Sequence, residues 1–129
     1  MTATKRFGKA ARGFRLKRVY EPASADDGLR VLVDRLWPRG VAKDKARIGQ
    51  WLKDVAPSNA LRRRFHGNPA KWNEFVVAYR RELAQEPAVA AVANLRVLAR
   101  EQPVTLVYAA RDQIHNNAVA LKKLLERKR

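Results

Sequence analysis

Residues 31–40, Val-Leu-Val-Asp-Arg-Leu-Trp-Pro-Arg-Gly, constrain the fold more than any other stretch of the chain. Residues 31–33 predict the middle of a buried strand, because β-branched side chains suit a pleated core. Pro38 lacks the N–H that a sheet ladder needs, so the strand must end before it. The polar residues that follow should lie at the C-terminal end of this strand, where α/β sheets bind ligands. They are Asp34, Arg35 and Arg39, with Trp37 between them.

A second stretch repeats this pattern further along the chain. Residues 104–110 form a continuous apolar run of strand length, which predicts a central buried strand. A helix should follow, with Asp112 as its cap, and a helix N-terminus favours anions. If the two strands are parallel neighbours, their C-terminal ends meet and form one cleft. The second stretch would contribute Tyr108, Arg111, Asp112, His115 and Asn116.

The remaining pattern predicts a small single-domain α/β fold, with about three mainly parallel strands flanked by four or five helices. The loop at residues 21–28 is too short for an ordinary helical crossover, so its length favours antiparallel pairing of the first two strands. The expected strands are residues 14–20, 29–37 and 104–110. The expected helices are residues 43–56, 57–65, 70–85 and 88–101, and a last one after residue 112 with Ile114, Ala118, Leu121 and Leu125 facing the core.

The composition excludes several classes of function. Cysteine is absent, so disulfides, thiolate catalysis and cysteine-based zinc sites are excluded. No window has the roughly 20 apolar residues that a membrane span needs, and no apolar segment predicts secretion. We therefore expect a cytoplasmic protein without membrane contact, and we predict neither a metal site nor a cofactor.

The net charge of +16 indicates polyanion binding, but the charge is concentrated at the two ends. Residues 1–18 contain seven Lys or Arg and no acid, and residues 122–129 contain five against one Glu. We expect residues 1–12 to be a basic flexible tail and residues 13–129 to be one α/β domain. Such a tail can bind nucleic acid weakly through counterion release, or it can simply be solvated.

The two polar stretches together resemble the YeaO-like branch of DUF488, a family of unknown function. The resemblance covers roughly residues 16–126 and implies a parallel sheet, contrary to the argument from loop length. Longer relatives often have cysteines near the second stretch, where this chain has Tyr108 and Ala109. The matching residues are 34–40, 51–53, 56–58, 61–62, Pro69, Trp72, Phe75, Tyr79, Leu83, 104–112, His115, Asn116 and Ala118.

Each candidate residue has a functional and a structural interpretation. His115 could act as a general acid or base, with Asp34 as its partner or as a second base. Alternatively, His115 could bond an aspartate for structure, and Asp34 could form a salt bridge with a nearby arginine. Arg39 and Arg111 could clamp a phosphate or carboxylate. The remaining candidate ligand-binding residues are Arg35, Trp37, Tyr108, Asp112 and Asn116.

Three functions remain open at this point. The first is an enzyme, or a ligand-binding relative of one, whose pocket takes an anionic, phosphate- or nucleotide-like molecule. The second is a non-catalytic nucleic-acid-binding protein that uses its basic tails and the Arg62-Arg63-Arg64 triplet. The third is a protein-interaction module, which would expose an apolar patch. The sequence identifies neither a substrate, a reaction nor an oligomeric state.

Overall fold

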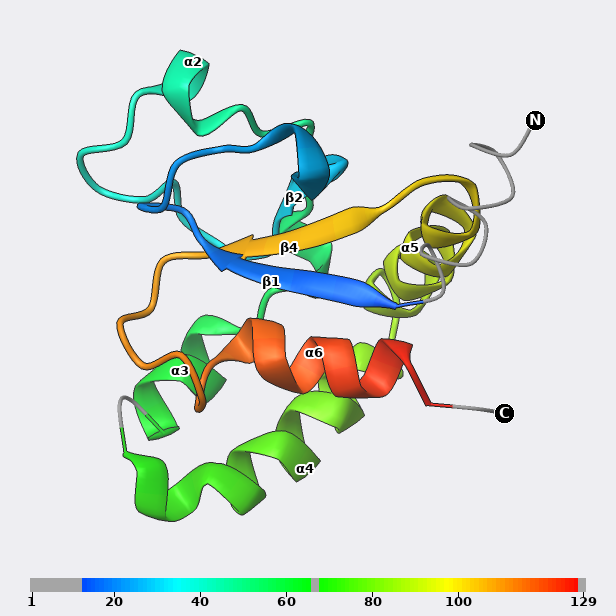
Figure 1. The fold of residues 1–129 in the computed structure, drawn as a ribbon. Coiled ribbons are helices and arrows are strands. Elements are labelled where there is room, and N and C mark those ends of the chain that lie inside the picture. Colours follow the sequence, from blue (N-terminus) through cyan, green and yellow to red (C-terminus); the bar gives the residue numbers. More distant parts are fainter. Residues whose placement is uncertain (1–12, 66–67, 128–129) are drawn as a thin grey trace.

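The computed structural model describes residues 13–65 and 68–127, which form a parallel sheet with helices packed against it (Figure 1). The strand order is β1-β4-β2-β3, and every neighbouring pair is parallel. The predicted α/β class is confirmed, with four strands in the described residues rather than about three. The strands are β1 (Phe14–Arg18), β2 (Leu29–Leu32), β3 (Gln50–Trp51) and β4 (Val104–Tyr108). The α-helices are α2 (Lys43–Ala46), α3 (Asn59–Phe65), α4 (Trp72–Leu83), α5 (Ala88–Glu101) and α6 (Asn117–Leu125).

The first two strands do not pair with each other, because β4 lies between them. The antiparallel pairing expected from loop length was therefore wrong, and the parallel sheet implied by the family resemblance is confirmed. The connection, residues 19–28, contains a short 3₁₀ turn, η1 (Ala25–Asp27), and no α-helix. Ten residues can span roughly 33 Å, whereas a five-residue strand is only about 17 Å long. A short connection can thus return along the sheet without a helix.

One face of the sheet is covered by helices, and most of the apolar core lies there. Val31 and Leu106 are fully buried on this face, together with Tyr79 of α4, Leu95 of α5 and Leu121 of α6. The apolar stripes predicted for residues 70–85 and 88–101 form α4 and α5, and the bounds of α5 agree with the prediction. Helices α4 and α6 lie together below the sheet in Figure 1.

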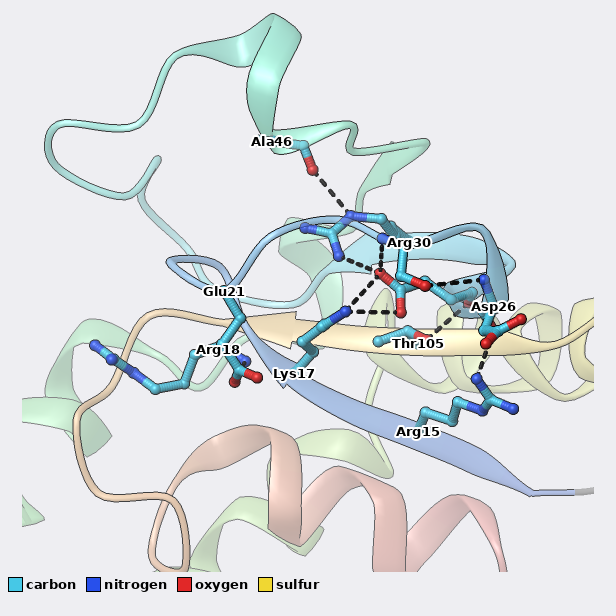
Figure 2. A network of polar contacts seen from close by, with 10 residues as sticks. Arg15, Lys17, Arg18, Glu21, Asp26, Arg30, Ala46 and Thr105 are labelled. Carbon is cyan, nitrogen blue, oxygen red and sulfur yellow. Dashed lines mark hydrogen bonds and ion pairs between the residues drawn. The ribbon is translucent and has the colours of Figure 1, made fainter.

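The opposite face is covered by loops and by a polar network. A small apolar cluster there contains Leu32 and Val107, with Trp37 and Trp51 packed against it. Beside it, residues of the β1–β2 connection bond to the sheet. In Figure 2 the side chains of Lys17 and Arg30 converge beneath the connection. Both bond to the buried Asp27 carboxylate, while the Thr105 hydroxyl donates to the Asp27 carbonyl oxygen at 2.7 Å.

The helix predicted over residues 43–56 was wrong. Helix α2 has four residues and ends at Ala46, because the next residue, Arg47, has a left-handed φ of 53°. The next residues join the sheet edge as β3, and the Gly49 N–H donates to the Arg30 carbonyl oxygen at 2.8 Å. A Cβ on Gly49 would lie 2.6 Å from Leu29 Cδ1, so glycine permits this close approach. Pairing with β2 thus overrides the helical spacing of the segment.

The last helix begins later than predicted. Helix α6 starts at Asn117, and its cap is Asn116, whose Oδ1 accepts from the Val119 N–H at 2.9 Å. The predicted cap at Asp112 was therefore wrong, and Ile114, expected in the core, is 69% exposed. Ala118, Leu121 and Leu125 are buried as predicted.

The three predicted strands also extend two to five residues less far than the apolar pattern suggested. The predicted tail at residues 1–12 lies outside the described residues. Within the part of the chain that is described, no helix is both long enough and apolar enough to cross a membrane.

Candidate functional site

A cleft of about 760 Å³ lies where the loops after β2 and β4 meet. Its other walls come from α3, from the start of α4 and from the 3₁₀ turn η3 (Pro69–Lys71). All but one of the nine predicted site residues line it; Tyr108 does not. The eight are Asp34, Arg35, Trp37, Arg39, Arg111, Asp112, His115 and Asn116.

Asp34 joins the two strand-end loops. Its Oδ2 accepts from the Ala109 N–H at 2.9 Å, and its Oδ1 accepts from Asn117 Nδ2 at 3.2 Å. No cationic group lies within ion-pair distance of it in residues 13–65 and 68–127. Burial raises the pKa of Asp34, and its two hydrogen bonds and the charge of Arg62 only partly offset this effect. The salt bridge considered for Asp34 is therefore not formed.

Arg35 and Trp37 each have a structural role in addition to lining the cleft. The Arg35 guanidinium donates from Nε to the Pro57 carbonyl oxygen and from Nη2 to the Ala56 carbonyl oxygen, both at 3.2 Å. The Trp37 indole N–H donates to the Val41 carbonyl oxygen at 2.7 Å, and its ring packs edge-on against Trp51. These contacts hold the loop after β2 in place.

Arg39 and Arg111 are the arginines most available to a ligand. Both are exposed and line the cleft, one from each strand-end loop. Neither guanidinium has a hydrogen-bond or ion-pair partner in the described parts of the chain. Arg62 of α3 also lines the cleft, and its Nη1 donates weakly to Asn59 Oδ1 at 3.3 Å. Guanidinium groups suit phosphates and carboxylates, which they can bind with two parallel hydrogen bonds.

His115 pairs with Asp112 rather than with Asp34. His115 Nδ1 lies 3.0 Å from Asp112 Oδ2, and Asp112 Oδ1 accepts the N–H groups of Ile114 and His115 at 2.9 Å each. These backbone N–H groups hold the pKa of Asp112 below its ordinary value. The His115 ring also meets Trp72 edge-on, with centroids 5.3 Å apart. When Nδ1 donates to Asp112, Nε2 is left as a hydrogen-bond acceptor.

Asn116 and Tyr108 mainly support the structure around the cleft. Asn116 is buried, and its Nδ2 donates to the Asp112 carbonyl oxygen at 2.8 Å while its Oδ1 caps α6. Tyr108 is only 3% exposed and packs in the core beneath the helices. Burial raises the pKa of its hydroxyl.

Sequence reasoning missed several residues of the cleft. Asn117 bonds both Asp34 and the Val33 carbonyl oxygen, the latter at 3.0 Å. Its position directly after the His115-Asn116 pair was the available signal. Arg62 had been considered only as one member of the charged triplet Arg62-Arg63-Arg64 and not as a cleft residue. The aromatic wall consists of Phe65, Trp72 and Phe75. It was missed because Trp72 and Phe75 fit the spacing of a helix core, although they also face the cleft.

The described lining contains an acid–base pair but few nucleophiles. It includes no Ser, Thr, Cys, Lys or Tyr side chain. Within residues 13–65 and 68–127, no group of three or more His, Asp or Glu side chains is placed to hold a metal ion. Apart from the carboxylates and His115, the polar groups are arginine donors and asparagine amides, which can bind an anion.

These features define a small parallel α/β protein with a basic cleft at the C-terminal edge of its sheet. The family model described as "Inactive DUF488-N3 subclade" matches residues 13–129, so the chain belongs to the DUF488 family, and the resemblance seen in the sequence is confirmed. Uncharacterized protein Rv3073c of Mycobacterium tuberculosis is 47% identical over 111 residues, covering 86% of this chain and 92% of the relative. Uncharacterized protein YeaO of Escherichia coli is 43% identical over 105 residues, covering 81% and 90%. No solved structure matches this chain.

Proposed function

We propose that the cleft binds a small anionic molecule that carries a planar ring, such as a nucleotide, without changing it chemically. The observation that carries this proposal is the pair Arg39 and Arg111. Both line the cleft from different loops, and neither guanidinium has a partner in the described chain. Arginines held in a cleft without carboxylate partners are available to an anionic ligand.

The aromatic wall supports a ligand with a ring. The rings of Trp72 and Phe75 are stacked, with centroids 5.6 Å apart, and Phe65 lies edge-on to Phe75 at 6.0 Å. A cleft of about 760 Å³ is within the usual range for small-molecule sites. An anion clamp beside an aromatic wall favours a phosphate joined to a heterocycle over phosphate alone.

Binding is favoured over catalysis by two observations. The subclade that this chain matches is described as inactive. The described lining also has no hydroxyl, thiol or amine nucleophile. The His115–Asp112 pair can instead accept a hydrogen bond from the ligand through Nε2 and keep the ring of Trp72 in place.

Titration of the full chain with adenosine monophosphate, inorganic phosphate and adenosine tests this proposal, followed by calorimetry and by tryptophan fluorescence. We expect the monophosphate to bind more tightly than either fragment. The double variant Arg39→Gln/Arg111→Gln should bind it about 100-fold more weakly or worse, because at least two charge-assisted hydrogen bonds are lost and each contributes roughly 1.5–3 kcal/mol. The matched control is Arg100→Gln, an exposed arginine of α5 outside the cleft, which should bind as the parent does.

Two results would contradict the proposal. Equal binding by the double variant and the control would show that the anion does not use the cleft. Mass spectrometry of the ligand after incubation should find it unchanged. Hydrolysis that Asp34→Asn or His115→Gln abolishes would instead make the protein an enzyme.

A further inference from the structure

We propose that the ligand enters the cleft as one nucleotide of a single-stranded nucleic acid, whose neighbouring phosphates lie on basic residues just outside the cleft. This inference rests on the anion- and ring-binding role proposed above and identifies the source of the anion. The outer residues are Arg63, Arg64 and Lys71, which we call the outer basic strip.

The residues of the strip are close in the chain to residues that line the cleft. Helix α3 lines the cleft through Arg62 and Phe65, and Arg63 and Arg64 lie between them in the same seven-residue helix. With about 3.6 residues per turn, Arg63 lies about 100° around the helix axis from Arg62, and Arg64 about 100° from Phe65, so both flank the cleft wall outside the cleft itself. Lys71 comes two residues after Pro69, which also lines the cleft.

The strip is positively charged and accessible. All three of its residues are exposed, and the first turn of α3 has no acidic residue. Arg63 has no hydrogen-bond or ion-pair partner among the residues that the structure describes. The Arg64 guanidinium lies over the Phe65 ring at 5.1 Å, which places a cation beside the aromatic wall. A small phosphorylated molecule held in the cleft would leave these charges unused.

A single strand fits this arrangement better than a duplex. Proteins that bind single strands combine a basic groove that follows the backbone with aromatic side chains on which bases stack. In a duplex the base faces are already stacked, so the wall of Phe65, Trp72 and Phe75 could not reach them unless a base were flipped out. An acidic protein or membrane surface would use the strip and leave the aromatic cleft empty.

Fluorescence anisotropy with labelled oligonucleotides and the full chain tests this inference. The probes are a six-nucleotide oligo-adenylate, a duplex of the same length, and polyglutamate as a polyanion without rings. We expect the single strand to bind at least tenfold more tightly than adenosine monophosphate and at least tenfold more tightly than the duplex or polyglutamate. Its binding should also quench tryptophan fluorescence, because Trp37 and Trp72 line the cleft.

The double variant Arg63→Gln/Arg64→Gln isolates the contribution of the strip. It should leave monophosphate binding unchanged and reduce the slope of log affinity against log salt for the single strand by about 1.4, since each phosphate contact contributes about 0.7. The matched control is Arg81→Gln/Arg100→Gln, two exposed arginines of α4 and α5 outside the cleft. Every variant keeps the basic residues 1–12, so differences between variants report on the strip.

The outcomes separate the two proposals. If the monophosphate binds through Arg39 and Arg111 but the strip variant keeps the parent's salt slope, this inference is overturned and the proposed function stands. If the monophosphate does not bind, the proposed function fails first. If duplex or polyglutamate binds as tightly as the single strand, the strip is a general polyanion surface and the inference is wrong.

Discussion

A buried carboxylate and a partly buried one lie at opposite ends of β2, and their surroundings differ. Asp27, just before β2, is 4% exposed and is surrounded by donors. Its carboxylate accepts from Arg30 Nη1 at 2.7 Å, from Lys17 Nζ at 3.0 Å and from the Ser24 N–H at 3.0 Å (Figure 2). Asp34, just after β2, accepts two hydrogen bonds from uncharged groups and pairs with no cation of the described chain.

This difference distinguishes the Asp27 carboxylate, which is held in a structural network, from the Asp34 carboxylate, which has no charged partner in the described chain. Burial alone would raise the pKa of Asp27, but hydrogen bonds from Lys17, the Ser24 N–H and Arg30 outweigh it and hold the pKa below its ordinary value. At Asp34 burial prevails and raises the pKa. Lys17 and Arg30 are paired with Asp27, whereas Arg39 and Arg111, which line the same cleft as Asp34, remain available. The protein thus pairs Asp27 with cations on one face of the sheet, whereas at the edge that forms the cleft Asp34, Arg39 and Arg111 have no ion-pair partner within the described chain.

The largest expected effect is at the paired site. Asp27→Asn should lower the free energy of unfolding by about 3–5 kcal/mol, because it leaves the buried Arg30 without its charge partner. One nitrogen of that guanidinium, Nη2, already lacks a hydrogen-bond partner within the described chain. Urea unfolding at pH 7 measures the change. The exposed neighbour Asp26→Asn is the control and should change the value by less than about 0.5 kcal/mol.

A double variant decides whether the loss comes from the unpaired charge. Adding Arg30→Met to Asp27→Asn should recover part of the stability, since it removes the buried charge. If the two substitutions were simply additive, Asp27 and Arg30 would not be coupled, and the interpretation of this network would be wrong.

The next effect is expected at the cleft, where the partner of Asp34 is the Asn117 amide rather than a cation. Asn117→Ala should destabilise the protein by about 1–3 kcal/mol, because the buried Val33 carbonyl oxygen loses its side-chain donor. It should also raise the pKa of Asp34 further, since the Asn117 amide donates to that carboxylate. Asn73→Ala, on an exposed position of α4, is the control for losing an amide. A variant as stable as this control would show that the Asn117 contacts contribute nothing.

A smaller effect is expected for Lys17, which is partly exposed. Lys17→Met should cost about 1 kcal/mol, near the net contribution of one hydrogen bond, because Arg30 still neutralises Asp27. The stability that Asp27 provides is present above its ordinary pKa and is lost as the pH falls through its lower native value. Without Lys17 the native pKa rises, so the acid-induced loss should begin at a higher pH. An unchanged acid midpoint in urea unfolding at pH 2 to 5 would contradict this account.

The fold was predictable where the signal was local and continuous. The spacing of apolar residues in 88–101 predicted a helix correctly, and the run at 104–110 predicted a buried strand, which the structure has at Val104–Tyr108. Residues 43–56 failed because Gly49 and its neighbours gain more from pairing with β2 than from forming a helix. The order of the strands also could not be predicted, since β4 inserts between β1 and β2 from the far end of the chain.

The location of the site could be predicted, but the hydrogen bonds within it could not. Two strand ends followed by polar residues indicated the cleft, because parallel strands end at the same edge. The pairing within it depends on side-chain directions that spacing does not fix. His115 bonds Asp112 because one tight turn carries both, whereas Asp34 reaches across to Ala109 and Asn117. The aromatic wall was missed because Trp72 and Phe75, which lie at the cleft, follow the same spacing as residues that face the core.

The smallest expected effect is a change in pH dependence at Asp34. A carboxyl group whose native pKa is raised holds its proton more tightly in the folded state, so its contribution to stability is present below the ordinary pKa and is lost as the pH rises through the native value. Asp34→Asn removes this titration. The stability of the variant relative to the parent should therefore increase as the pH rises from about 4 towards neutrality and then level off, as measured by urea unfolding at each pH. Asp44→Asn, on the exposed helix α2, is the control for replacing a carboxylate with an amide. A relative stability that decreases with pH would mean that Asp34 has a lowered pKa and a cationic partner, and the contrast with Asp27 would no longer hold.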